Sequence, residues 1–383
     1  MQNDNSRYRQ RRSSESYQPF PDFPEHPDYG DDYNENETEN RSDRQPKKER
    51  PPRKRKKGRV LKILLSIILI AVLLFGVYFS LIIFRIHYTN ENPDEESIVA
   101  EAGELQSDEN VQNVLIFGTD HHDDDEYGRS DSIILLSIDK QNHCLKQTSF
   151  LRDIYLTIPG YGEDKLNAAY SYGGPKLAAE TIEYNFRIRI DQYAIIDFES
   201  FTTIIDALGG IDLHLTYDEV DYIDWQSHKN KQTDTRHELD ADSYTYETDE
   251  DGNETALVHL NGRQSLWYAR DRDSEGSDFD RTSRQRTVIN TVFSQLKSSN
   301  PITFMHVLCS AAPMITTNMS VGDVVAAAFG SIGYLNYERE EYRVPRGDNF
   351  SNSWAGDAAV LTIDDMDYER ESLYDFIYHS NDE

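Results

Sequence analysis

The sequence predicts a layered α/β domain that follows one transmembrane helix. Three observations predict this fold class. A run of 22 uncharged, mostly apolar residues, 63–84, is long enough to cross a bilayer. Beyond residue 111, short aliphatic segments alternate with helical ones, which is the pattern of an α/β layered fold. The total of 383 residues suits one large domain with appendages.

The apolar run is flanked by opposite charges. Residues 53–57 (RKRKK) precede it, whereas residues 91–96 (ENPDEE) follow it. The positive-inside rule then places the N-terminus in the cytoplasm and residues 85–383 outside. A cleaved signal peptide is disfavoured because a long polar segment comes first. We therefore expect a single-pass protein of the cell membrane with most of its mass outside.

The rest of the chain divides by composition. Residues 1–59 are rich in charged, Asn, Ser and Pro residues, which predicts a disordered cytoplasmic tail. Residues 60–84 are the membrane helix, and residues 85–110 indicate a short acidic extracellular stalk. The extracytoplasmic domain should occupy residues 111–383. An acidic, Tyr-rich stretch over 218–256 interrupts it, and we interpret this stretch as a surface loop or insertion.

Strands and helices can be placed in order along the domain. Short aliphatic runs predict buried strands at 111–118 and 132–138, and further strands are predicted at 144–151, 192–198, 211–215 and 360–365. A turn at Asp139–Asn142 joins the second and third strands as a hairpin. Helices are predicted at 175–186, 199–208 and 280–297. Pro175 suits the first helical position of one, and Gly209 and Gly210 close another.

Charge and cysteine content exclude several functions. The 69 acidic residues outnumber the 39 basic ones, for a net charge of −30. Such a chain lacks the cationic surface that binds nucleic acid, so any bound anion must meet a local group of arginines. The two cysteines, Cys144 and Cys309, are too few for a disulfide framework. Two buried free thiols are the simpler expectation, although the two could pair.

Two aspartates flank the loop between the first two predicted strands. Asp120 follows strand 111–118, and Asp131 comes just before strand 132–138. If these strands are neighbours, both carboxylates lie at one sheet edge, where ligands of open α/β folds bind. Converging carboxylates can hold Mg²⁺, which prefers oxygen ligands and shares them with phosphates. The His121–Asp125 run also offers metal ligands, but a solvated loop is the simpler interpretation.

Three further stretches combine basic and polar side chains. The first contains Arg152 and Asp153, and the second contains Lys165 and Asn167. The third contains Arg270, Arg272, Arg281, Arg284 and Gln285. A spacing of two in an extended segment puts Arg270 and Arg272 on one face. Arg281 and Arg284 are one helical turn apart. In so acidic a chain this group indicates bidentate phosphate recognition. Arg–Asp alternation by itself is more typical of a salt-bridged surface.

Seven motifs resemble, in their order, the LytR–CpsA–Psr (LCP) family of wall glycopolymer transferases. They are NVLIFGTD, RSDSIILLSID, SFLRDIYLTIPGYG, DKLNAAYSYGG, DQYAIIDFESFTTIIDALGGIDLHL, HLNGRQSLWYAR and DFDRTSRQR, between Asn113 and Arg286. The resemblance implies a layered α/β/α domain with a central mixed sheet and a motif-bearing core over residues 113–297. It also implies a hydrophobic pocket for a polyprenyl tail.

The resemblance assigns roles to residues in these motifs. Asp120 and Asp131 would hold Mg²⁺, or Mn²⁺ in its place. Pyrophosphate would be bound by Arg129, Arg152, Arg270, Arg272 and Gln285, with Arg281, Arg284, Lys165 and Asn167 behind them or at the rim. Asp131 and Asp153 are the candidates for the base that accepts a hydroxyl proton, with Arg152 assisting catalysis. Asp280 stands where the family usually has glycine, and we expect it to face outward.

The implied reaction moves a phosphoglycan from a polyprenyl-pyrophosphate carrier to peptidoglycan and forms a phosphodiester. The polymer would be teichoic acid, capsule or a related wall glycan. We thus expect a Mg²⁺-dependent phosphotransferase whose partners are the lipid-linked glycan, the peptidoglycan acceptor and the membrane, with no nucleic acid. Hydrolysis of the lipid pyrophosphate and non-catalytic regulation of envelope synthesis stay open as alternatives. The predicted topology excludes DNA binding by the outer domain.

Overall fold

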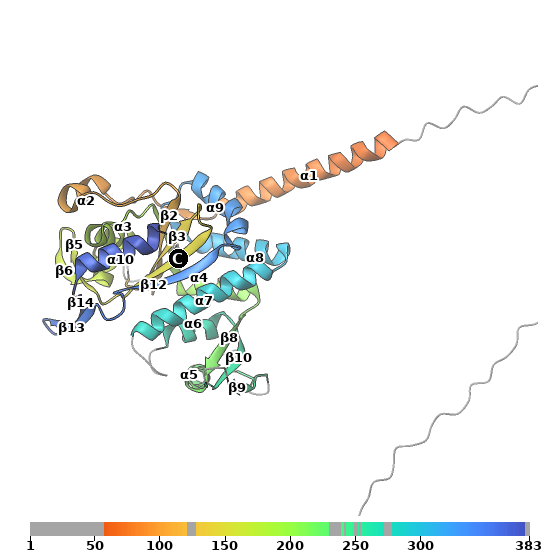
Figure 1. Ribbon diagram of the computed structural model, residues 1–383. Coiled ribbons are helices and arrows are strands. Elements are labelled where there is room, and N and C mark those ends of the chain that lie inside the picture. The colour runs from red at the N-terminus through yellow and green to blue at the C-terminus, as the bar shows by residue number, and fades with distance from the viewer. Residues whose placement is uncertain are drawn as a thin grey trace, which may run out of the picture. The chain divides into compact units, whose positions relative to one another are not determined.

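The computed structural model describes residues 57–120, 128–229, 239–240, 243–248, 252, 254–271 and 278–379. The predicted tail up to residue 56, the His121–Asp125 run and Arg272 lie outside these residues. The described chain consists of one apolar helix and a mixed α/β domain (Figure 1).

The apolar run forms helix α1, Lys57–Ile83. Its stretch Leu61–Ile83 is long and apolar enough to cross a membrane. The leucine and isoleucine side chains along it are exposed, except for Ile82 and Ile83 at its end. An apolar helix with its side chains turned outward is the form expected when lipid is the surrounding solvent.

A seven-stranded mixed sheet forms the centre of the domain. Its strands follow the order β1 (His87–Tyr88), β11 (Thr316–Thr317), β7 (Gln192–Asp197), β2 (Val111–Thr119), β3 (Ser130–Asp139), β4 (Cys144–Phe150) and β12 (Glu338–Val344). β2, β3 and β4 pair antiparallel, whereas β7 pairs with β2, and β12 with β4, in parallel. The predicted mixed sheet is confirmed, and so are the four predicted strands that lie within it.

Helices cover both faces of this sheet (Figure 1). On one face, alternate residues of β2 such as Leu115 and Phe117 pack in a core with α3 (Leu166–Phe186) and α10 (Met366–Tyr378). On the other face, α7 (Asp278–Ser298) reaches β3 and β4 through hydrogen bonds from Ser132 to Gln285 and from Gln147 to Asn290. This is the predicted α/β/α layering, and α7 is the predicted helix 280–297.

A second core lies beside α7. It joins α4 (Phe198–Leu208), α6 (Gly262–Arg270) and α8 (Pro301–Ala311) to a small sheet of β8 (Ile211–Thr216), β10 (Glu254–Leu260) and β9 (Tyr246–Thr248). Further elements include helix α9 (Val321–Tyr334) and the ribbons β5 (Tyr155–Ile158)–β6 (Gly162–Lys165) and β13 (Phe350–Ala355)–β14 (Ala358–Ile363). The strand predicted at 360–365 is β14, which α10 follows.

The stretch 218–256 is more regular than a surface loop. Its start forms helix α5 (Tyr217–Lys229), and its end belongs to β9 and β10. Val220 and Ile223 lie on one helix face and are buried, as are Ala256 and, just beyond the stretch, Val258. The loop alternative is therefore wrong for the described part of this stretch, because a few aliphatic residues at the correct spacing outweigh many acidic neighbours.

The predicted stalk, 85–110, belongs to the folded domain. β1 lies in this segment and pairs with β11 at the edge of the central sheet. Helix α2 (Glu95–Ala102) buries Ile98, and the backbone N of Asp94 donates to Oε1 of Glu180 on α3 at 2.8 Å. The domain therefore begins near His87 instead of Val111, because these contacts compensate for the acidic composition that suggested a linker.

Both cysteines are free thiols. Burial, together with the nearby Glu340 carboxylate, raises the pKa of the Cys144 thiol to about 12. Because the thiolate is the reactive form, Cys144 should stay unmodified when the folded full chain meets a maleimide at pH 8. Peptide mass spectrometry after labelling checks this prediction. Modification of Cys144 as fast as in denaturant would contradict it.

Candidate active site

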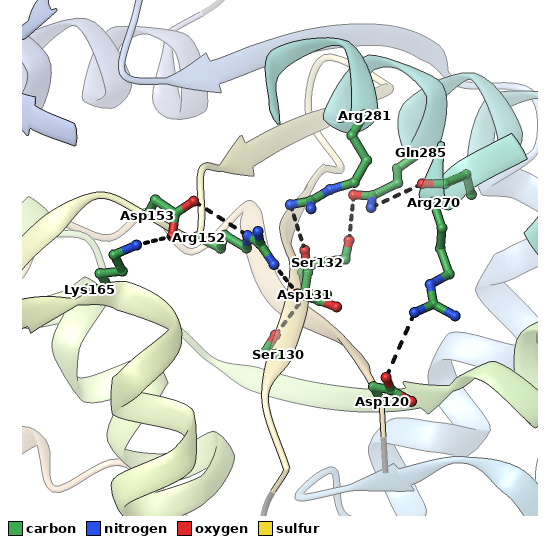
Figure 2. Close-up of polar contacts among 11 residues, drawn as sticks. Asp120, Ser130, Asp131, Ser132, Arg152, Asp153, Lys165, Arg270, Arg281 and Gln285 are labelled. Atoms are coloured by element: carbon green, nitrogen blue, oxygen red, sulfur yellow. Dashed lines mark hydrogen bonds and ion pairs between the residues drawn. The ribbon is translucent and has the colours of Figure 1, made fainter. Parts of the chain in front are cut away.

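The candidate site lies at the sheet edge where β2 ends and β3 begins. Asp120 follows β2 directly, and Asp131 is the second residue of β3. Because the two strands pair antiparallel, both carboxylates lie at one edge, as predicted (Figure 2). The close pairing depends on Gly118, since a Cβ added to it would lie 2.9 Å from the Cβ of Ser132.

A row of ion pairs runs from Asp131 to the β5–β6 ribbon (Figure 2). Nη1 of Arg152 binds Oδ1 of Asp131, and Nε of Arg152 lies 3.5 Å from Oδ2 of Asp153. Nζ of Lys165 lies 2.8 Å from Oδ1 of Asp153. The four side chains are between 19% and 25% exposed, so water screens their charges only in part.

The backbone around Arg152 explains this alignment. Arg152 lies two residues beyond the end of β4, and its carbonyl oxygen accepts from the backbone N of Asn167 at 3.1 Å. The backbone N of Leu166 donates to the carbonyl oxygen of Ile154 at 2.8 Å. Asn167 is itself buried, so it acts behind the site by holding the backbone of Arg152.

Helix α7 places two more predicted residues at the same edge. Arg281 is 2% exposed, and its Nη2 donates to the backbone oxygen of Asp131 at 3.3 Å. One turn later, Oε1 of Gln285 accepts from Oγ of Ser132 at 2.8 Å. A guanidinium buried beside Asp131 adds positive potential where an anion would bind. Asp280 is exposed, as expected.

Arg270 approaches the edge from another element. It is the last residue of α6, whose start carries a capping box between Asn261 and Gln264. Nη2 of Arg270 lies 3.8 Å from Oδ2 of Asp120, and its guanidinium carbon lies 4.2 Å from the centre of the Phe198 ring. The extended segment predicted for Arg270 is wrong, because α6 continues to this residue. Phe198 was missed by sequence reasoning.

Two arginines differ in environment from the rest. Arg284 points away from the carboxylate edge, with Nε 2.8 Å from Oε1 of Glu219 and Nη2 3.9 Å from Oδ2 of the buried Asp271. Arg284 therefore holds the segment that follows Arg270 in place and does not face the edge where phosphate would bind. Arg129 is exposed, and its backbone oxygen accepts from the N of Asp120 at 3.5 Å.

A pocket of about 360 Å³ adjoins this edge. It is lined by main-sheet, α3 and flanking residues, namely Thr89, Glu91, Thr119, Gly128, Tyr170, Pro175, Tyr193, Ile195, Asp197, Met314 and Thr316. Thr119 precedes Asp120 and Gly128 precedes Arg129, so one end of the pocket meets the charged edge. Thr119, Tyr170 and Tyr193 belong to the quoted motifs, whereas Thr89, Met314 and Thr316 come from segments outside them that lie far away in the chain.

Asp120 and Asp131 fit a magnesium ion by their chemistry. Two carboxylates provide hard oxygen donors and leave the other positions for phosphate oxygens and water. Among the described residues no group of three or more His, Cys, Asp and Glu side chains could hold a metal. A cation at this edge would therefore need oxygen atoms from a bound phosphate and from water in addition to the two carboxylates.

The edge of the central sheet thus brings arginines and aspartates together beside a pocket. Residues 77–355 match the LytR_cpsA_psr family profile. Because this match covers well over half of the sequence, the chain belongs to the LytR–CpsA–Psr family.

Named relatives and a solved structure extend this comparison. The polyisoprenyl-teichoic acid–peptidoglycan teichoic acid transferase TagV of Bacillus subtilis (strain 168) is 31% identical over 205 residues, 52% of this chain and 47% of TagV. The regulatory protein MsrR of Staphylococcus aureus (strain Mu50) is 31% identical over 209 residues, 54% of this chain and 55% of MsrR. The matches thus span about half the length of these relatives.

The crystal structure of B. subtilis TagT has the same fold. Its TM-score is 0.54 at 20% sequence identity, and the superposition covers 76% of this chain and 99% of TagT. The layered domain with a mixed sheet is therefore shared with a solved member of the family.

The position of Arg270 depends on close packing of α6 against α4. A Cβ on Gly262 would lie 2.1 Å from the backbone oxygen of Thr202 on α4. Gly262→Ala is therefore expected to destabilise the domain by about 1–3 kcal/mol. Thermal unfolding of the full chain in detergent checks this. Gly333→Ala is the control, because a Cβ there meets nothing within 4 Å, and equal midpoints for the two variants would contradict the prediction.

Proposed function

We propose that this protein is an enzyme that transfers a phosphoglycan from a polyprenyl-pyrophosphate carrier to peptidoglycan. The observation that carries the proposal is the pairing of Arg152 with Asp131 and of Arg270 with Asp120 beside the 360 Å³ pocket. The similarity to TagV, which is named a teichoic acid transferase, supports the reaction class. The polymer is a teichoic acid or a related wall glycan, such as capsule.

The charges of the site suit an exchange of partners. Pyrophosphate would take the guanidiniums of Arg152 and Arg270, which bind phosphate bidentately, with Arg129, Arg272 and Gln285 at its flanks. The two aspartates released in this exchange would hold Mg²⁺, for which Mn²⁺ can substitute. The two arginines would thus pair with aspartates when the site is empty and with pyrophosphate when substrate is bound, and the aspartates would then pair with Mg²⁺. In this way a protein of net charge −30 can bind an anionic lipid.

The proposed step is a displacement at phosphorus. The oxygen of an acceptor hydroxyl bonds to the phosphorus that bears the glycan, and the bond from this phosphorus to the bridging oxygen breaks. Lipid phosphate leaves with the electron pair. The hydroxyl proton passes to Asp153, the candidate base that is not also a proposed metal ligand. Bound Mg²⁺ would neutralise charge on the phosphate oxygens.

Three arrangements of the chain support this chemistry. Arg152 is positioned by Asn167 and joined through Asp153 to Lys165. Arg281, buried beside Asp131, adds fixed positive charge that costs no reorganisation during the reaction. The polyprenyl chain would occupy the pocket lined by Tyr170 and Tyr193, between the sheet and α3.

The proposed location is the outer face of the cell membrane. Helix α1 would anchor the protein with its N-terminus in the cytoplasm, as the basic run before it predicts. A domain held at this surface meets lipid-linked glycans and the wall together. Nucleic acid has no place among its partners, because the outer domain is separated from it by the membrane.

Omission of the acceptor tests the reaction class. The full chain in detergent would receive a labelled lipid-pyrophosphate oligosaccharide with or without peptidoglycan oligomers. A transferase releases lipid phosphate in proportion to an acceptor-linked product. Release at full speed without acceptor would identify a pyrophosphate hydrolase that uses the same arginines.

The name of MsrR favours one second candidate, a membrane-bound regulator. A regulator would act without turnover, so cells carrying Arg270→Ala would retain wall-linked polymer. A transferase predicts loss of that polymer at an unchanged amount of the membrane protein. Chemical analysis of purified walls separates the two functions.

A further inference from the structure

Two tyrosine rings lie stacked and exposed on the ectodomain surface. The centroids of Tyr161 and Tyr172 are 5.1 Å apart, and the ring planes differ by 14°. Tyr161 is 61% exposed and Tyr172 is 43% exposed. Large aromatic rings usually bury most of their area, so a stacked pair left open to solvent indicates a contact surface.

Glycines on both segments keep the pair at the surface. Tyr161 is at the turn between β5 and β6, between Gly160 (φ +79°) and Gly162 (φ +91°). Tyr172 precedes Gly173 and Gly174, where the helical backbone of α3 is interrupted. Positive φ angles favour glycine, so the sequence maintains two tight turns around these rings.

Hydrogen bonds tie the pair to the candidate active site. The hydroxyl of Tyr172 donates to Oδ2 of Asp164 at 2.5 Å, which raises the pKa of Tyr172. Asp164 precedes Lys165, whose Nζ binds Asp153. Oγ of Ser171 donates to the carbonyl oxygen of Gly128 at 2.9 Å, next to Arg129. The two rings thus adjoin the Asp153 side of the charged edge.

Tyr170 and Tyr172 lie close together in the sequence but face different environments. Tyr170 is 4% exposed and lines the 360 Å³ pocket, whereas Tyr172 is open to water. A lipid in the pocket would therefore not reach the stacked rings. Glu163 and Asp164 lie beside them and would repel a polyanionic glycan such as the donor polymer.

We propose that Tyr161 and Tyr172 form a platform for the acceptor glycan, on which one sugar ring stacks through its C–H face. Flat aromatic faces suit the apolar face of a pyranose, and the nearby hydroxyl and carboxylate oxygens suit its hydroxyl groups. The platform would bring an acceptor hydroxyl to the Asp153 side of the site. The proposal rests on the transferase function and names its second substrate site.

Steady-state kinetics with the full chain in detergent test the platform. The double variant Tyr161→Ala/Tyr172→Ala is expected to raise KM for peptidoglycan oligosaccharides about tenfold, with KM for the lipid-linked donor and kcat within about twofold of wild type. Tyr161→Phe/Tyr172→Phe keeps the rings and should restore KM. Tyr368→Ala, which removes a tyrosine that is 48% exposed on α10, is the matched control and should change nothing.

A binding measurement separates this proposal from the reaction itself. Saturation-transfer NMR with an unlabelled peptidoglycan oligosaccharide reports contact without turnover, and the signal should weaken in the double alanine variant. If the double alanine variant has the wild-type KM for the acceptor, the platform is overturned while the transferase function stands. If its KM for the donor rises as much as its KM for the acceptor, the assignment of the platform to the acceptor is overturned. If the wild-type protein transfers no glycan, the proposed transferase function is wrong. In that case an NMR signal that is equally strong in wild type and in the double alanine variant would overturn the platform as well.

Discussion

Arg152→Ala is expected to lower the rate of phosphoglycan transfer by about 10²- to 10³-fold. Arg152 lies between Asp131 and Asp153 and is 19% exposed, so its loss leaves two partly buried carboxylates beside the proposed phosphate. The variant therefore loses a cation that stabilises the transition state and gains repulsion toward the substrate. The rate constant kcat, measured with a labelled lipid-pyrophosphate oligosaccharide and peptidoglycan oligomers, gives the effect.

Two further variants define the cause of this loss. Arg152→Lys keeps the charge but lacks the planar fork that binds two oxygens, so we expect an intermediate rate. Arg370→Ala removes an arginine that pairs with Asp367 on α10 and is 31% exposed, and it should retain the wild-type rate. A wild-type rate for Arg152→Ala, at an unchanged unfolding temperature, would exclude Arg152 from the site.

Asp131→Ala is expected to remove magnesium-dependent turnover, with a fall of at least about a hundredfold in kcat. The Asp131 carboxylate binds Arg152, and its backbone oxygen accepts from the buried Arg281. Alanine keeps the backbone contact and deletes the carboxylate, so the change should act on the metal and on Arg152 more than on the fold. A titration of rate against Mg²⁺ should saturate for wild type and stay flat for the variant.

An exposed carboxylate elsewhere provides the control for Asp131. Asp212 on β8 is 55% exposed and pairs with His259, and it contacts neither Arg152 nor Arg270. Asp212→Ala should preserve both the rate and its dependence on Mg²⁺. Near-normal, magnesium-dependent rates in Asp131→Ala would remove Asp131 from the proposed metal site.

The sheet could be predicted from the sequence where apolar patterning is strong. β2 and β3 are short aliphatic runs, and a recognisable turn leads from β3 to β4, so the three strands were placed to within two residues of their bounds. β12 was missed because its sequence, EREEYRV, is charged, and it forms a strand by pairing in parallel with β4. Pairing with a distant segment leaves no local signal in composition.

The candidate site could be predicted where the functional residues follow strands. Asp120 and Asp131 lie at one edge because β2 and β3 are neighbours, which was the condition for the predicted site. The different role of Arg284 depends on Glu219, a residue in a stretch interpreted as loop. The ring of Phe198 under Arg270 depends on how α4 and α6 pack, which is a tertiary property.

One reaction tests whether the arginine–aspartate edge transfers a phosphoglycan to the wall. The most direct measurement incubates the full chain with lipid-pyrophosphate oligosaccharide, peptidoglycan oligomers and Mg²⁺, and detects the phosphodiester-linked product by mass spectrometry. We expect product with wild type, none with chelator, and at least about a hundredfold less with Arg270→Ala, which removes the partner of Asp120. Equal amounts of product from wild type and Arg270→Ala, or product that persists in chelator, would contradict this expectation.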